Sequence, residues 1–223
     1  MSFGWLFRSG LALVLSLIVL IYLVRAGLWR RFPLVGPFCI VQIVVILIDT
    51  IAVLIGLPRR LQVQMIWTGD MVAHAAISLL IISLIWQTLD EGPRKNTVLL
   101  LTAGVMGFAL ASSYVFYDVR LSRWMTPVSR NLSFCEEVLN LILWSLLLKG
   151  KTSDYLLLMV SAGIGVQVTG EVIGHTLRVY ASESIMWVPN TLVFISELVC
   201  LGIWIWAFRT AANRAVPALL KTS

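Results

Sequence analysis

Seven apolar runs separated by short polar connections constrain the fold of this chain more than any other feature of its sequence. Each run is close to the roughly 20 residues with which an α-helix crosses the hydrocarbon layer of a bilayer. The sequence therefore predicts an all-α fold, a single bundle of seven transmembrane helices with a short tail over residues 209–223. The predicted helices cover residues 10–24, 34–57, 63–88, 97–117, 131–148, 155–180 and 187–208.

The composition indicates the same class of protein. Of the 223 residues, 59% are hydrophobic and only 13% are charged, against about 25% charged in a soluble domain. The formal net charge is +6, but the Lys and Arg residues lie mostly in the connections, where lipid head groups are their natural partners. We therefore expect a multi-pass membrane protein whose partner is the lipid bilayer, and no binding of nucleic acid.

The distribution of basic residues predicts the orientation, since cytoplasmic connections carry an excess of Lys and Arg. Seven lie on the side of the N-terminus: Arg8, Arg59, Arg60, Arg120, Arg123, Arg130 and Arg178. Ten lie on the other side: Arg25, Arg30, Arg31, Arg94, Lys95, Lys149, Lys151, Arg209, Arg214 and Lys221. We expect the N-terminus outside and the C-terminus in the cytoplasm.

Ionisable side chains inside a membrane are costly and are by default candidates for function. We estimate the depth of each ionisable side chain by counting about 1.5 Å per residue from the predicted helix end. These side chains fall in the outer half of the membrane, whereas Leu, Ile, Val and Phe dominate the inner half. This predicts an outward-facing acidic polar cavity above a dry apolar region. The candidate ligand-binding or cation-binding residues are Asp49, Asp70, His74, Glu136, Glu137, Gln167, Glu171, His175 and Glu197.

Two helices carry an acid followed by a histidine four residues later, a spacing that puts both side chains on one helical face. The pairs are Asp70 with His74 and Glu171 with His175. If the two helices meet, the four side chains can bind a divalent metal; alternatively, each acid hydrogen-bonds a histidine without a metal. Bis-histidine haem is disfavoured, because the estimated depths separate the imidazoles by about 9 Å.

Two further patterns concern packing. Glu136 and Glu137 are adjacent and point about 100° apart on a helix, so one of them should face the bundle together with Ser133 and Asn140. Gly170 and Gly174 form a G-x-x-x-G pattern, which predicts close packing of their helix against a neighbour.

Three segments carry a family resemblance. The run LWRRFPLVGPF before the second helix, the Trp67-x-x-Asp70 pair and the closing run LGIWIWAF resemble an uncharacterised family of bacterial seven-helix integral membrane proteins. The resemblance implies the fold and a location in the bacterial cytoplasmic membrane, but no activity. Related bundles serve as sensor modules with a cytoplasmic output domain; here the stretch after Phe208 is short, which implies a separate cytoplasmic partner.

Two functions remain open from the sequence. The first is a sensor-like module that binds a small ligand or a cation in the polar cavity. The second is a metal-dependent, hydrolase-like membrane enzyme with Asp70, His74, Glu171 and His175 as ligands and Glu136 or Glu197 as general base. The site is rich in carboxylates and poor in histidine, which suits hard cations better than catalytic zinc. We therefore expect a non-enzymatic protein with a possible divalent metal and assign no catalytic residue.

Overall fold

The computed structural model describes residues 3–89, 91–115, 121–150 and 154–220, and within these residues the fold is all-helical. Seven long helices are each long and apolar enough to cross a membrane, which confirms the predicted seven-helix bundle. Two short 3-10 turns, η1 (Leu28–Arg30) and η2 (Glu183–Ile185), lie in connections. The long helices are α1 (Phe3–Arg25), α2 (Val35–Leu54), α3 (Arg59–Thr88), α4 (Glu91–Val115), α5 (Leu121–Lys149), α6 (Tyr155–Tyr180) and α7 (Trp187–Leu220).

The helix bounds agree with the predicted ones only in part. The predicted range 155–180 coincides with α6. In contrast, α5 begins ten residues before the predicted range 131–148 and contains Pro127, and α7 continues through most of the predicted tail to Leu220. Hydropathy marks only the part of a helix that lies in hydrocarbon, whereas backbone hydrogen bonding continues into polar, helix-favouring sequence.

A glycine closes α2. Gly56 adopts a left-handed conformation with φ of 72°, its N–H donates to the carbonyl of Val53 at 3.2 Å, and the N–H of Leu57 donates to the carbonyl of Ala52 at 3.1 Å. This is a Schellman motif, in which glycine avoids the steric cost of positive φ. Pro58 then precedes α3 and cannot extend α2. The chain thus reverses in a tight connection that brings α2 and α3 side by side.

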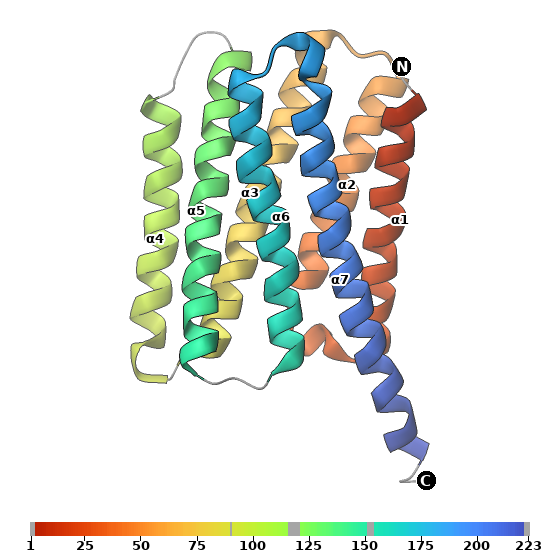
Figure 1. Ribbon diagram of the computed structural model, residues 1–223, viewed down its shortest axis with the longest axis vertical. Coiled ribbons are helices and arrows are strands. Elements are labelled where there is room, and N and C mark those ends of the chain that lie inside the picture. The colour runs from red at the N-terminus through yellow and green to blue at the C-terminus, as the bar shows by residue number, and fades with distance from the viewer. Residues whose placement is uncertain (1–2, 90, 116–120, 151–153, 221–223) are drawn as a thin grey trace.

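Six of the helices form a closed ring. Each helix in the order α1, α2, α3, α5, α6, α7 packs against the next, and α7 packs against α1. The fourth helix, α4, lies outside this ring against α3 and α5 (Figure 1). The side chain of Asn131 on α5 donates to the hydroxyl of Ser112 on α4 at 3.0 Å, one polar link that holds α4 to the ring.

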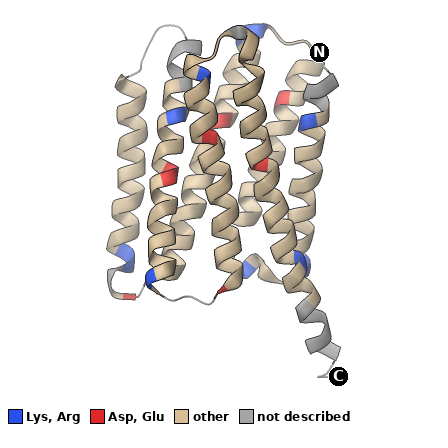
Figure 2. Cartoon of the chain, viewed as in Figure 1, with Lys and Arg blue, Asp and Glu red and all other residues tan. Residues whose placement is uncertain are grey.

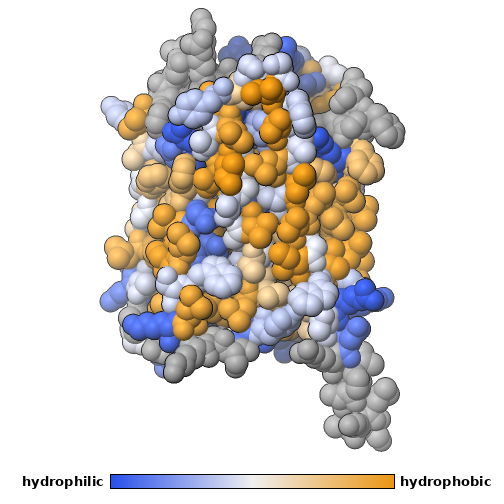
Figure 3. Space-filling view, in the orientation of Figure 1, coloured by the Kyte–Doolittle hydropathy of each residue, from blue (hydrophilic) through white to orange (hydrophobic). Residues whose placement is uncertain are grey.

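The two ends of the bundle differ from its middle. We call the end where α1 begins the N-terminal end, and the end from which α7 projects the C-terminal end (Figure 1). Lys and Arg gather towards both ends, and most acidic residues within the helices lie between the middle and the N-terminal end (Figure 2). Hydrophobic residues cover most of the middle of the face shown in Figure 3. This pattern matches a protein immersed in a bilayer.

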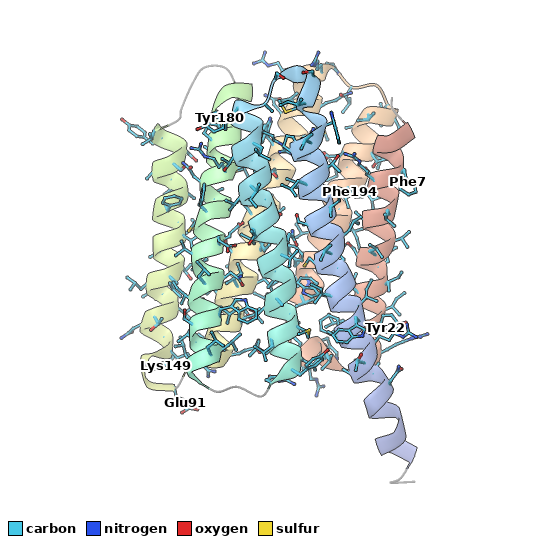
Figure 4. All side chains as sticks on the ribbon, viewed as in Figure 1. Phe7, Tyr22, Glu91, Lys149, Tyr180 and Phe194 are labelled. Carbon is cyan, nitrogen blue, oxygen red and sulfur yellow. The ribbon has the colours of Figure 1, made fainter. Side chains whose placement is uncertain are left out.

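The interior towards the C-terminal end is apolar and tightly packed. Trp204 is fully buried, its ring packs edge-on against Phe38 at 5.7 Å between centroids, and its indole N–H donates to the carbonyl of Val160 at 3.0 Å. Phe208 packs against Phe32 nearby, with centroids 6.1 Å apart. Side chains fill the space between the helices, while Glu91 and Lys149 lie at the surface of this end (Figure 4). The expected region of packed apolar side chains is therefore observed among the described residues.

Candidate polar site inside the bundle

Three helices bring five ionisable side chains together. Asp70 and His74 come from α3, Glu136 from α5, and Glu171 and His175 from α6. We call these five residues the polar cluster. The four-residue spacing puts each pair from α3 and α6 on one face of its helix, and both helices contact α5 and each other. The convergence of the two acid and histidine pairs, expected from the sequence, is thus observed.

The strongest contacts within the cluster join His74 to Glu136. The His74 Nδ1 atom lies 3.1 Å and 3.2 Å from the two carboxyl oxygens of Glu136. The hydroxyl of Ser78 donates to Glu136 Oε1 at 3.2 Å. Glu136 is 0% exposed and His74 is 4% exposed. An ionised Glu136 accepts hydrogen bonds only, which assigns a proton to Nδ1 in that state. In either protonation state of Glu136, this contact from α5 sets the orientation of the imidazole.

The second nitrogen of His74 has no such partner. Its Nε2 atom is buried without a hydrogen-bond partner among the described residues, and it lies 3.8 Å from Asp70 Oδ2. Asp70 itself accepts a hydrogen bond from the hydroxyl of Ser129 at 2.5 Å. A buried polar atom without a partner costs about 1–3 kcal/mol. Within the cluster, the Nε2 atom of His74 is therefore the atom that a bound ion or water molecule would stabilise most.

The α6 side of the cluster is held by hydrogen bonds of its own. Gln167 donates to Glu171 Oε1 at 3.0 Å. Arg178 donates from Nη1 to His175 Nδ1 at 3.2 Å and from Nε to the side-chain oxygen of Asn190 on α7 at 2.9 Å. Arginine has no acceptor, so Nδ1 of His175 offers its lone pair to Arg178 and the ring proton of the neutral imidazole is on Nε2.

Two groups in the cluster have ligand atoms spaced as around a metal ion. One ligand atom each from Asp70, His74 and His175 lie within 4.8 Å of one another, and so do those of His74, Glu136 and Glu171. Ligands at about 2.0–2.4 Å from a metal are separated by up to twice that distance. A small cavity of about 20 Å³ adjoins the cluster and is lined by Gln42, Asp70, Ala73, His74, Ile77, Gln167 and Glu171. That volume holds one water molecule or one ion.

One estimate made from the sequence is wrong. The depths of the two histidines counted from the helix ends differ by about 9 Å, but the ring centroids of His74 and His175 lie 6.1 Å apart. Counting from helix ends assumes that the ends of all helices are level. Counted from the observed start of α3 at Arg59, the difference would be larger still, so the ends of α3 and α6 lie at different levels. The depth argument against haem therefore fails. Instead, the cavity of about 20 Å³ leaves no room for a porphyrin beside these rings.

Three of the nine candidate residues lie away from the cluster. Asp49 lines a groove on the outer face of α2 and α3. Glu137 accepts a hydrogen bond from Thr169 at 3.1 Å beside another groove, between α5, α6 and α7. Glu197 on α7 is partly exposed and belongs to neither group of metal-spaced ligand atoms. The expectation that they share one cavity with the other candidates is not matched by this geometry.

Adjacent acids on α5 divide as their helical positions require. Glu136 faces the interior together with Ser133 and Asn140, all three of them buried, whereas Glu137 is partly exposed towards α6. One member of the pair therefore faces the bundle, as the 100° rotation between adjacent residues predicts.

Four polar contributors to the site were not identified from the sequence: Ser78 and Ser129, which donate to Glu136 and Asp70, and also Gln42 and Arg178. Gln42 of α2 lines the cavity, and its signal was a lone amide within an apolar run. Arg178 holds His175, and its signal was the three-residue spacing from His175 on one helical face. In each case the residue type was visible, but its partner was determined by contacts between helices.

The fold and the cluster define a polytopic α-helical membrane protein with a buried polar site. Comparison with known proteins finds no match: no protein-family model, no curated protein sequence and no solved structure matches this chain. The resemblance to bacterial seven-helix membrane proteins therefore stays a prediction.

Proposed function

We propose that this protein is a non-enzymatic, sensor-like membrane module that binds one divalent cation inside the bundle. The observation that carries the proposal is the Nε2 atom of His74, which is buried, has no partner among the described residues and lies beside Asp70 at a small polar cavity. A lone pair facing a carboxylate across 3.8 Å repels it unless a cation or a proton lies between them.

The proposed ligands are His74 Nε2 and the carboxylates of Asp70 and Glu171, which line one cavity. Asp70 and Glu171 belong to different groups of metal-spaced ligand atoms, so binding requires the two carboxylates to move closer together. Glu136 accepts the Nδ1 proton of His74, the outer-shell arrangement that orients a metal-binding imidazole and raises its basicity. The amides of Gln42 and Gln167 line the same cavity and supply further oxygen atoms. One imidazole with several oxygen ligands suits Mn²⁺ better than Zn²⁺.

His175 is not needed as a ligand under this proposal, although the sequence suggested it. Arg178 donates to its Nδ1 atom, so Nε2 carries the proton and has no lone pair to give a metal. The role that fits His175 is to fix the guanidinium of Arg178 close to the carboxylates. The proposed metal ligands are therefore Asp70, His74 and Glu171, without the His175 that the sequence suggested as a fourth.

Cation binding suits a sensor because its ligands come from separate helices. Asp70 and His74 belong to α3 and Glu171 belongs to α6, while Glu136 ties His74 to α5. A bound cation draws these carboxylates together, and without it their mutual repulsion favours a wider spacing. With the N-terminus outside, the cavity lies in the outer half of a bacterial cytoplasmic membrane, and the signal passes to a separate cytoplasmic partner.

The alternative of a metal-dependent enzyme has less support. The sequence suggested Glu136 or Glu197 as the general base of such an enzyme. Glu136 is fully buried and already accepts hydrogen bonds from His74 and Ser78, so it cannot reach a substrate. Glu197 belongs to neither group of metal-spaced ligand atoms.

Metal analysis tests the proposed function. Protein purified in detergent is equilibrated with Mn²⁺ or Zn²⁺, passed through a desalting column, and measured by plasma mass spectrometry. We expect about one metal ion per chain, lost in Asp70→Ala and His74→Gln but retained in His175→Gln. Glu137→Gln is the matched control, since it changes an intramembrane acid outside the cluster. A wild-type protein without metal, or one whose metal survives both Asp70→Ala and His74→Gln, would contradict the proposal.

A further inference from the structure

A second site lies on the outer face of the bundle, away from the polar cluster. The outer surfaces of α2 and α3 enclose a groove of about 470 Å³, within the range of roughly 300–1,000 Å³ for small-molecule sites. Its walls are mostly apolar, with Ile40, Val44 and Ile48 from α2 and Met65 and Val72 from α3. Three polar residues also line it: Asp49, Gln64 and Thr68.

Two of the polar residues, Asp49 and Gln64, lie at one end of the groove. Asp49 lies five residues before the end of α2 and Gln64 lies five residues after the start of α3, so each is about 7–8 Å from the end of its helix that lies at the N-terminal end of the bundle. Ile40 lies nine residues before Asp49, about 13 Å further along α2 and past its midpoint. The groove is therefore polar near the membrane surface and apolar towards the bilayer centre, the order in which an amphiphile lies in a leaflet.

The polar end lacks a partner that the protein could supply. Asp49 Oδ1 is buried without a hydrogen-bond partner among the described residues. A carboxylate at this depth is costly unless something donates to it. The groove between α5, α6 and α7 also holds an acid, but there Thr169 donates to Glu137 at 3.1 Å. Of these two acids, Asp49 is therefore the one whose buried oxygen has no donor among the described residues.

We propose that the groove between α2 and α3 binds a single-tailed amphiphile whose head group donates hydrogen bonds, with the head group at Asp49 and Gln64 and the alkyl chain along Val44, Ile40 and Val72. The ligand enters sideways from the leaflet, because the groove opens on the lipid-facing surface of the bundle, where Val44 and Val72 are exposed. This site is separate from the cation site and does not depend on the proposed function.

Binding of radiolabelled hexadecylamine to the protein in phosphatidylcholine nanodiscs tests the proposal, with empty nanodiscs as the background. We expect saturable binding that unlabelled hexadecylamine displaces and that methyl palmitate, which has no donor, displaces at least tenfold less well. Asp49→Asn should weaken binding about tenfold or more, the effect of losing one charge-assisted hydrogen bond. Glu137→Gln is the matched acid control and should bind as the wild type does.

A second pair of variants tests the alkyl-chain part of the groove. Val72→Trp should fill it and remove binding, while Val14→Trp, at an exposed position on α1, should leave binding unchanged. If Val72→Trp does not fold, Val44→Trp fills the same groove from α2. Equal binding by Asp49→Asn and the wild type, equal displacement by methyl palmitate, or no saturable binding would each refute the proposal. A change of oligomeric mass in Val72→Trp, together with no saturable amine binding by the wild type, would also refute the proposal. That outcome identifies the groove as an interface between helices of two copies.

Discussion

The contact between α6 and α7 at Gly170 allows a sharp test of the packing that positions the polar cluster. A Cβ atom added at Gly170 would overlap the side chain of Ser196 on α7 and lie 3.7 Å from its Cα atom. Gly174, one turn further along α6, faces Val193 and the carbonyl oxygen of Pro189 in the same way. The close packing expected from the G-x-x-x-G pattern is therefore observed, and the neighbour is α7.

The expected cost of Gly170→Ala follows from two opposing terms. Overpacking by one methyl group in a tight contact costs about 1–3 kcal/mol, and the alanine returns up to about 1 kcal/mol in helix propensity. Gly202→Ala, on α7 itself, places its Cβ where no heavy atom lies within 4 Å. It gains the same propensity without the overlap. The difference in stability between the two variants therefore reports the overpacking alone.

Thermal unfolding in detergent, followed by tryptophan fluorescence, measures this difference. In a protein of this size, each kcal/mol of lost stability lowers the unfolding midpoint by roughly 2–4 °C. A difference of about 2 kcal/mol should therefore make Gly170→Ala unfold about 4–8 °C below Gly202→Ala. Adding Ser196→Gly to Gly170→Ala removes the side chain that overlaps, and should recover most of the loss through a coupling of about 1–2 kcal/mol. Equal midpoints for Gly170→Ala and Gly202→Ala, or purely additive effects in the double variant, would refute the described contact.

Two further predictions concern the ends of the bundle. Reporter fusions should place the N-terminus outside and the C-terminus in the cytoplasm, as the distribution of basic residues indicates; a cytoplasmic N-terminus would move the polar cluster to the inner leaflet. Asp154 accepts a hydrogen bond from the backbone N–H of Leu157 at 3.3 Å and pairs with Arg31. Asp154→Ala removes this helix-capping hydrogen bond and should destabilise the protein by about 1 kcal/mol. Asp154→Asn keeps the capping hydrogen bond and loses only the ion pair with Arg31, worth about 0–1 kcal/mol. Equal losses of stability in thermal unfolding would show that the capping hydrogen bond contributes nothing.

The sequence by itself determined the features that depend on local chemistry. Insertion of a helix into a membrane depends on the length and apolarity of one continuous segment, so the seven helices could be found without knowledge of their neighbours. The shared face of Asp70 and His74, and that of Glu171 and His175, follows from 3.6 residues per turn. The separation of Glu136 from Glu137 follows from the same geometry.

Only the tertiary structure decided which of these faces meet and at what level. Nothing in the spacing of residues predicts that Glu136 of α5 contacts His74, or that Arg178 donates to the Nδ1 atom of His175. Relative depth depends on where each helix begins, on its tilt and on the ridges and grooves of its neighbours, which is why the estimated distance between the histidines was wrong. Asp49 was counted as part of one shared cavity for the same reason. A helix determines the direction of its own side chains, but packing against other helices determines which space those side chains enter.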